Sequence, residues 1–270
     1  MVETVNVNPN NKNIYNDIPL TKDESVLMEG LKSMIKKENL TYNKDKIDEN
    51  YLIRFLRARK LKLDKALDMF KKYLIFRQEN SYIENIENTT IPEEADILTY
   101  LPQGYHKTDK FDRPIYYELL GRLNLDKLLQ ITTLDNLFKH RIKVLENMIS
   151  NILPAASLSA KRNIHQYFSI IDLKGFSSKF LSKKFYEYIK STLTATQNYY
   201  PEILGQMYIV NSNLVFKGAW AIIKPFLDEK TKSKIIFSGK DYKKRLLENV
   251  IQKIFYLFIY RLQTIIFLHF

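Results

Sequence analysis

The second half of the chain alternates short apolar runs with longer segments of helical period, and this alternation constrains the fold more than any other feature. Runs of β-branched and aromatic residues bounded by turn residues predict strands, and they lie at Arg113–Leu120, Gln166–Gly175, Gln206–Asn211 and Ser233–Gly239. Segments with helical apolar spacing lie between them, at Leu134–Ile152, Ser178–Tyr199 and Val215–Leu227. Strands separated by helices form βαβ units, so we predict an α/β domain with a mixed, largely parallel sheet.

The first third of the chain predicts a small all-helical part. Thr21 is followed by Glu24, the spacing of a capping box, and apolar residues then recur at helical spacing to about Gln78. The first residues are polar and lack the apolar stretch of a signal peptide. We therefore expect a flexible lead-in over 1–20, a helical part over 21–80, a polar connector, an α/β domain over 95–250 and an apolar tail over 251–270.

The net charge and the absence of cysteine limit the kinds of partner and site that we expect. Lys and Arg number 42 against 30 Asp and Glu, a net charge of +12 that favours polyanions such as nucleic acid or an anionic membrane surface. The absence of cysteine excludes disulfides, thiolate metal sites and a cysteine nucleophile, and it is compatible with the cytoplasm.

Enzyme signatures are missing from the sequence. It contains no GxGxxG, Walker A, GxSxG or HExxH motif. Asp109 and Asp112 could form an acid/base pair, but "HKTDKFDRP" is more typical of a turn leading into a strand. Four histidines are too far apart in sequence to indicate a metal cluster and are interpreted as structural or surface residues: His106, His140, His165 and His269. We expect no catalytic residues, no metal and no cofactor.

The 18 Tyr and 16 Phe residues suggest either an ordinary core or a cavity for an apolar ligand. Five sequence blocks bear on the choice between these two possibilities: "YLIRFLRARKLKLDKALDMF", "GYHKTDKFDRPIYYELLGRLN", "IIDLKG", "QNYYPEILGQMYIVN" and "AIIKPFLDEKTKSKI". In this order they resemble the Sec14-like, or CRAL-TRIO, lipid-transfer proteins over roughly residues 23–247. The resemblance implies a helical N-terminal part and an α/β domain whose sheet floors an apolar pocket for one phospholipid.

The resemblance also implies a head-group site. In members that bind phosphatidylinositol, a basic pair, an acidic residue and a Lys beside a Thr hold the inositol phosphate. The matching positions here are Arg59, Lys60, Glu202, Thr231 and Lys234. Lys suits a phosphate and Glu accepts hydrogen bonds from hydroxyl groups, whereas a buried unpaired phosphate would be costly. The alternative is that "RARK" is a solvated helix face.

The family's choline site is altered in this sequence. Members that bind choline lipids have a Ser and a Thr at the positions of Tyr167 and Ser169, and Leu145 replaces an expected tyrosine. Tyr105 and Tyr116 remain, and tyrosine faces can hold a quaternary ammonium. Because the Tyr167 phenol would fill the space of the choline phosphate, we expect weak phosphatidylcholine transfer and allow a different second lipid.

A helix similar to Val215–Phe226 would close the pocket in this family. It combines apolar and basic residues, which predicts docking to anionic membranes. The expected gate and membrane-contact residues are Phe216, Lys217, Trp220, Ile223, Lys224 and Phe226. The alternative is that Trp220 is ordinary core packing.

The tail departs from the family pattern. Residues 254–270 are strongly apolar, but about 17 residues that include Arg261 are marginal for a membrane span. Three interpretations stay open: a membrane-associating tail, a helix packed on the domain, and an incorrectly assigned last exon.

The resulting hypothesis is a non-enzymatic phosphatidylinositol transfer or presentation protein. We expect a monomer with no nucleic-acid partner that meets Golgi or endosomal membranes from the cytoplasm and offers lipid to lipid kinases. One alternative is a carrier of a retinoid, tocopherol or sterol, which would not need the inositol-site residues. The other, a lipid-sensing module that binds a small GTPase, is not separated from the main hypothesis by the sequence.

Overall fold

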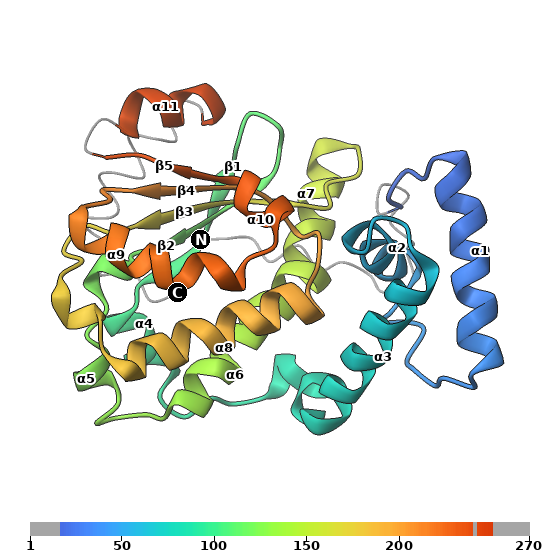
Figure 1. Ribbon diagram of the computed structural model, residues 1–270, viewed down its shortest axis with the longest axis horizontal. Helices are drawn as coiled ribbons and strands as arrows, with labels where there is room; N and C mark the ends of the chain where they lie inside the picture. Colours follow the sequence, from blue (N-terminus) through green and yellow to red (C-terminus); the bar gives the residue numbers. More distant parts are fainter. Residues whose placement is uncertain (1–16, 240–241, 251–270) are drawn as a thin grey trace.

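The computed structural model describes residues 17–239 and 242–250 (Figure 1). The predicted helical part consists of α1 (Lys22–Lys37), α2 (Glu49–Ala58) and α3 (Leu63–Glu79). Its core is apolar and aromatic, with Phe55, Phe70 and Tyr73 fully buried. The predicted capping box is confirmed, because the Thr21 hydroxyl accepts the Glu24 N–H at 3.2 Å and the Glu24 carboxylate accepts the Thr21 N–H at 3.0 Å.

The second part of the chain is built on a five-stranded mixed sheet. Its strands are β1 (Gln103–Thr108), β2 (Pro114–Glu118), β3 (Tyr167–Asp172), β4 (Leu204–Val210) and β5 (Ile235–Phe237), in the spatial order β1-β2-β3-β4-β5. The pair β1–β2 is antiparallel, and the other three pairs are parallel. The largely parallel sheet and its α/β class are therefore confirmed.

The edge strand β1 is missing from the sequence-based prediction. Its sequence, QGYHKT, lacks an apolar alternation, and its residues are half-buried or exposed at the sheet edge. The turn that follows is as expected, because the Asp109 carboxylate accepts the N–H groups of Phe111 and Arg113, each at 2.9 Å. Asp109 thus fixes the turn between β1 and β2.

Helices cover both faces of the sheet (Figure 1). Those between β2 and β4 are η2 (Leu120–Arg122), α5 (Leu125–Leu128), α6 (Leu134–Asn147), η3 (Met148–Ile152), α7 (Leu153–Ala160), η4 (Ser178–Phe180) and α8 (Lys183–Tyr199). Those after β4 are α9 (Leu214–Ile223), η5 (Lys224–Phe226), α10 (Glu229–Ser233) and α11 (Tyr242–Asn249). One sheet face packs Phe168 and Ile170 with Leu246 of α11, and the opposite face faces α8 and α9.

The connector between the two parts is more structured than its polar composition suggests. It contains η1 (Ser81–Asn88) and α4 (Glu94–Tyr100). Ile83, Ile86, Ile91 and Ile97 are buried and anchor it against the rest of the protein. A sparse set of isoleucines is enough to fix a segment whose other residues are solvated.

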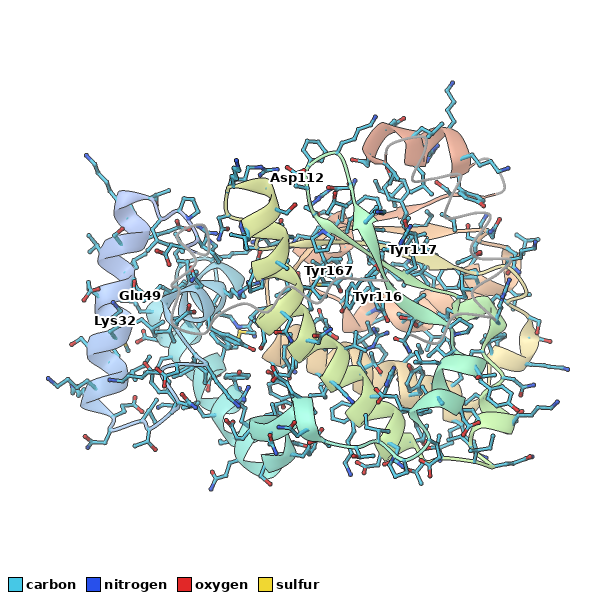
Figure 2. The ribbon with its side chains drawn as sticks, turned by 180° about the vertical axis from the view of Figure 1, so that it is seen from behind. Lys32, Glu49, Asp112, Tyr116, Tyr117 and Tyr167 are labelled. Atoms are coloured by element: carbon cyan, nitrogen blue, oxygen red, sulfur yellow. The ribbon has the colours of Figure 1, made fainter. Side chains whose placement is uncertain are left out.

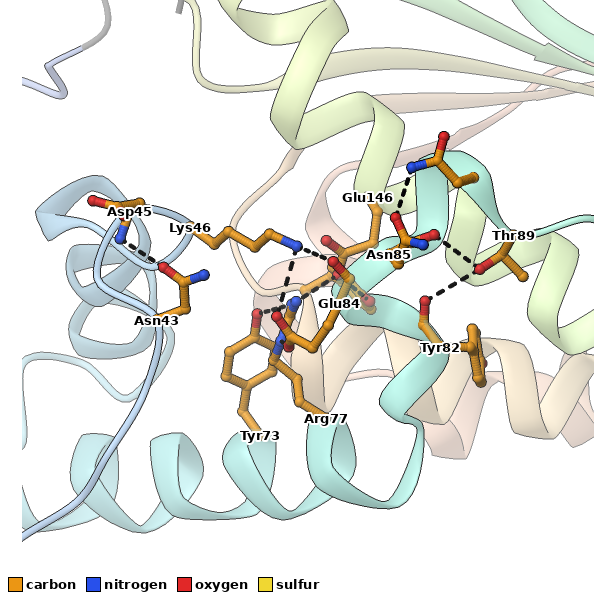
Figure 3. Close-up of polar contacts among 12 residues, drawn as sticks. Asn43, Asp45, Lys46, Tyr73, Arg77, Tyr82, Glu84, Asn85, Thr89 and Glu146 are labelled. Carbon is orange, nitrogen blue, oxygen red and sulfur yellow. Dashed lines mark hydrogen bonds and ion pairs between the residues drawn. The ribbon is translucent and has the colours of Figure 1, made fainter.

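A buried polar network joins the helical part to the α/β domain (Figure 3). Arg77 of α3 lies 3.2 Å from Glu146 of α6 and 2.7 Å from Glu84 of η1. The Tyr200 hydroxyl donates to the same Glu146 carboxylate at 2.7 Å. Burial raises the pKa of Glu146, while Arg77 and Tyr200 oppose that rise. The network fixes the loop that carries Glu202, two residues after Tyr200.

Within the described ranges, no helix is both long and apolar enough to cross a membrane. Most of the expected lead-in and the whole expected apolar tail, residues 251–270, lie outside the described residues.

Candidate functional site

A cavity of about 420 Å³ lies between the sheet and helices α8, α9 and α10. This volume is within the range of roughly 300–1,000 Å³ that is usual for ligand pockets. Apolar side chains from the sheet and the helices line it, among them Ile171, Ile189, Met207, Ile209 and Ile235. The sheet therefore floors a largely apolar cavity, as the resemblance implies.

Charged residues gather at one rim of this cavity. Glu202, whose side chain is only 11% exposed, lies 2.6 Å from the Lys230 ammonium and 3.7 Å from the Lys234 ammonium. Lys234 also donates to the Leu204 carbonyl at 2.7 Å. Burial lowers the pKa of Lys234, and Glu202 opposes this effect. The Glu202 carboxylate is thus a buried anion between two cations. In this arrangement a lysine can bind a phosphate instead of Glu202, and Glu202 can then accept hydrogen bonds from hydroxyl groups.

The other three predicted head-group residues line the same cavity. Arg59 and Lys60 lie at the end of α2, where Arg59 is half-buried and Lys60 is exposed. The Thr231 hydroxyl donates to Asp228 at 2.8 Å and so remains tied to the start of α10. The structure thus brings all five predicted positions to one cavity, from three separate segments of the chain.

Two of these residues have unusual backbone geometry. Lys60 and Glu202 both adopt left-handed conformations, with φ of 53° and 61°. Such conformations are costly for residues other than glycine and persist where the surroundings fix them, often at functional sites.

Lys230 is the site residue that the sequence-based prediction missed. Among the described residues, Glu202 forms ion pairs with Lys230 and Lys234. The spacing of Lys230 and Lys234, four residues apart, could have revealed the second lysine, since that spacing places both on one face of a helical turn.

The five positions matched to the choline site form a packed group at the cavity wall. The rings of Tyr105 and Tyr116 lie 5.3 Å apart, and those of Tyr116 and Tyr167 lie 6.3 Å apart. Figure 2 shows Tyr116 and Tyr167 on the neighbouring strands β2 and β3. Leu145 and Ser169 are buried beside them, and Tyr167 alone of the five lines the cavity. The Tyr167 side chain therefore forms this part of the cavity wall.

All the predicted gate residues except Phe226 fall into two groups on α9 and η5. Phe216, Trp220 and Ile223 line the cavity, and the Trp220 ring packs 4.8 Å from that of Phe237. Lys217 and Lys224 are exposed.

Phe226 belongs to neither group, because its ring packs 5.8 Å from that of Tyr186 on α8. The exposed apolar residues of α9 are instead Leu214 and Ile222, with exposed fractions of 80% and 53%. Trp220 thus faces the cavity, while two other residues present apolar surface to solvent.

No cluster of potential metal ligands occurs among residues 17–239 and 242–250. His140, one of the histidines interpreted as structural, is buried 3.2 Å from the Glu94 carboxylate.

Sequence comparisons identify relatives that match most of the chain. Residues 26–72 match the CRAL/TRIO, N-terminal domain, and residues 98–255 match the CRAL/TRIO domain. The chain is 38% identical to the Sec14 cytosolic factor of Schizosaccharomyces pombe, over 76% of this chain and 72% of that protein. It is 36% identical to the SEC14 cytosolic factor of Eremothecium gossypii, over 86% of this chain and 74% of that protein.

A plant relative and a solved structure extend this result. The protein named phosphatidylinositol/phosphatidylcholine transfer protein SFH7 of Arabidopsis thaliana is 35% identical over 88% of this chain, which spans only 43% of the plant protein. The crystal structure of Sfh5 is similar in fold, with a TM-score of 0.64, 18% identity and 84% coverage of both chains. Because the CRAL/TRIO domain spans more than half of the sequence and the N-terminal domain precedes it, this Sec14-like chain belongs to the CRAL-TRIO family.

Proposed function

We propose that the protein binds one phosphatidylinositol molecule in the cavity and exchanges it with membranes. The observation that carries this proposal is the Glu202 carboxylate, held between Lys230 and Lys234 at the rim of an apolar cavity. A lipid with one phosphate and several hydroxyl groups complements this rim, and its acyl chains complement the apolar wall.

The binding step follows from the charges. A phosphate entering the rim takes over the Lys234 ammonium, and Glu202 then accepts hydrogen bonds from inositol hydroxyls. Arg59 and Lys60 supply further positive charge from the end of α2. Charge-assisted hydrogen bonds of this kind compensate for the dehydration of the phosphate.

The names of the relatives support the same class of ligand. Two relatives are called Sec14 cytosolic factors, and one is called a phosphatidylinositol/phosphatidylcholine transfer protein. We extend to this chain a cytosolic, peripheral role at membranes, acting as a monomer without catalysis and presenting lipid to lipid kinases.

Mass spectrometry of the lipids that copurify with the expressed protein tests the choice of ligand. We expect phosphatidylinositol to be the main species. Recovery of a retinoid, tocopherol or sterol without any phosphatidylinositol would contradict the proposal and favour another kind of hydrophobic-ligand carrier.

A further inference from the structure

A second polar cluster is buried at the other end of the cavity. Arg141 of α6 lies 2.6 Å from Glu118 of β2 and donates to the Tyr116 hydroxyl at 2.9 Å. Arg141, Glu118 and Thr192 of α8 all line the cavity. Glu118 is level with Ile171 and, through it, with Ile209 on β4. Since strands rise by about 3.3 Å per residue, this level is roughly 16 Å along β4 from Leu204, beside the Glu202 rim.

Several donors in this cluster have no hydrogen-bond partner. The Arg141 Nε, the Thr192 hydroxyl and the Ser169 hydroxyl are buried and unpaired. Ser169 and Thr192 are only 1% and 6% exposed. Ser169 shares a sheet face with Tyr167 and Ile171, which both line the cavity. Buried polar groups rarely remain unpaired, so each such group calls for a partner.

Tyr188 of α8 lies beside two of these donors. Burial raises the pKa of Tyr188 to about 12, although Arg141 and Thr192 beside it lower the value. Tyr188 is therefore close to both residues, yet the Arg141 Nε and the Thr192 hydroxyl still lack a well-formed hydrogen bond. The Arg141 Nε–H requires an acceptor, and the Thr192 hydroxyl can donate to the same group.

The charges of the cluster exclude two kinds of lipid head. The Arg141 guanidinium lies 5.6 Å from the centre of the Tyr116 ring, where it occupies an aromatic face that a choline group would need. A phosphate would add a second negative charge beside Glu118. Arg141 would not compensate for that charge, because it is already neutralised by Glu118.

We propose that Arg141 and Thr192 form a second polar subsite that accepts the oxygen of an uncharged lipid, either a diacylglycerol ester carbonyl or a sterol hydroxyl. The proposal rests on the proposed function only in that the cavity holds lipid. The second ligand is then an uncharged lipid whose oxygen accepts a hydrogen bond, in place of a choline lipid.

The test loads the full chain from vesicles that contain phosphatidylinositol together with one other lipid. The second lipid is dioleoylglycerol, cholesterol, phosphatidylcholine or phosphatidic acid, and the bound lipids are quantified after the protein is separated from the vesicles. We expect dioleoylglycerol or cholesterol to be taken up about tenfold more than the two charged-head lipids, the effect of one charge-assisted hydrogen bond. The two neutral arms distinguish an ester carbonyl from a sterol hydroxyl.

Equal or greater uptake of phosphatidylcholine or phosphatidic acid overturns the inference. Phosphatidylinositol uptake, measured in the same samples, tests the proposed function separately, so the two failures are distinguishable.

Two variants tie the selectivity to the cluster. Thr192→Val removes a hydroxyl with little change of shape, and the ratio of neutral lipid to phosphatidylinositol uptake should fall several-fold. The double variant Arg141→Met, Glu118→Gln removes the ion pair without leaving one charge unpaired. It should lower neutral-lipid uptake and raise phosphatidylcholine uptake. An unchanged ratio in folded Thr192→Val protein, verified by circular dichroism, overturns the inference even if the double variant does not fold.

Discussion

The Lys230 ammonium lies 2.6 Å from one oxygen of Glu202, and Lys234 lies 3.7 Å from the other. The two lysines differ in their surroundings, because the Lys230 side chain is 54% exposed and that of Lys234 only 17%. An exposed ion pair contributes little and is screened by salt, whereas a buried cation depends on having a partner. We therefore propose that Lys234 holds the phosphate and that Lys230 makes a weaker, exposed contact.

Glu202→Gln should lower phosphatidylinositol transfer between vesicles by about tenfold or more, because it removes the charged acceptor of the inositol hydroxyls. Fluorescent-lipid transfer measures the effect. Glu29→Gln is the matched control, since Glu29 lies on α1 outside the cavity lining, with a side chain that is 73% exposed and paired with Lys32. Equal transfer by the two variants would contradict the role of Glu202.

Membrane docking should depend on the exposed apolar residues of α9. Leu214→Asn together with Ile222→Asn should reduce binding to anionic vesicles in a sedimentation assay, since it removes apolar surface that enters the bilayer boundary. Val26→Asn is the control, because Val26 is 73% exposed on α1 in the helical part. Equal loss from both surfaces would exclude α9 as the docking face.

The single tryptophan reports on the same event from inside the cavity. Trp220 emission should shift to the blue on addition of anionic vesicles, and the shift should shrink as salt rises, because the exposed Lys217 and Lys224 are screened. A spectrum that is indifferent to vesicles would count against movement of α9 at the membrane.

The boundary network should contribute to stability. Tyr200→Phe removes a 2.7 Å hydrogen bond to the buried Glu146 and should destabilise the protein by about 1–3 kcal/mol. Thermal unfolding followed by circular dichroism measures this, with Tyr100→Phe on α4 as the control. Identical midpoints for the two variants would show that the network does not stabilise the boundary.

Acid should weaken the helical part through Glu24. The hydrogen bond with Arg57 lowers the pKa of Glu24 to about 2. A carboxyl with a lowered folded-state pKa stabilises above its unfolded value and loses that contribution as pH falls toward the folded value. The thermal midpoint of the wild type should thus fall more steeply between about pH 5 and about pH 2 than that of Glu24→Gln. Parallel curves would contradict this assignment.

Much of the fold could be predicted because the apolar period differs between its elements. The strands β2 to β5 and helices α6, α8 and α9 overlap the predicted segments, with ends that differ by a few residues. The edge strand β1 could not be predicted, because its pairing with β2 rests on backbone hydrogen bonds and its side chains carry no alternation. The structure of the connector could not be predicted either, because its isoleucines are buried only by contact with other parts of the protein, which the local sequence does not show.

The candidate site was predicted in part for a similar reason. Glu202 and Lys234 match a family pattern and therefore stand out in the sequence. Arg141 belongs to no such pattern, and a single arginine on an amphipathic helix is usually solvated. Only the fold brings it to Glu118, which precedes it by 23 residues in the chain.

The central claim is tested most directly by phosphatidylinositol transfer between vesicles with Lys234→Ala and Lys232→Ala compared side by side. Both lysines are near the end of α10, but Lys234 lines the cavity and Lys232 does not. Because a buried phosphate without a cation is costly, transfer should be abolished in Lys234→Ala and retained in Lys232→Ala, with nearly unchanged thermal midpoints. Undiminished transfer by folded Lys234→Ala protein would contradict the account.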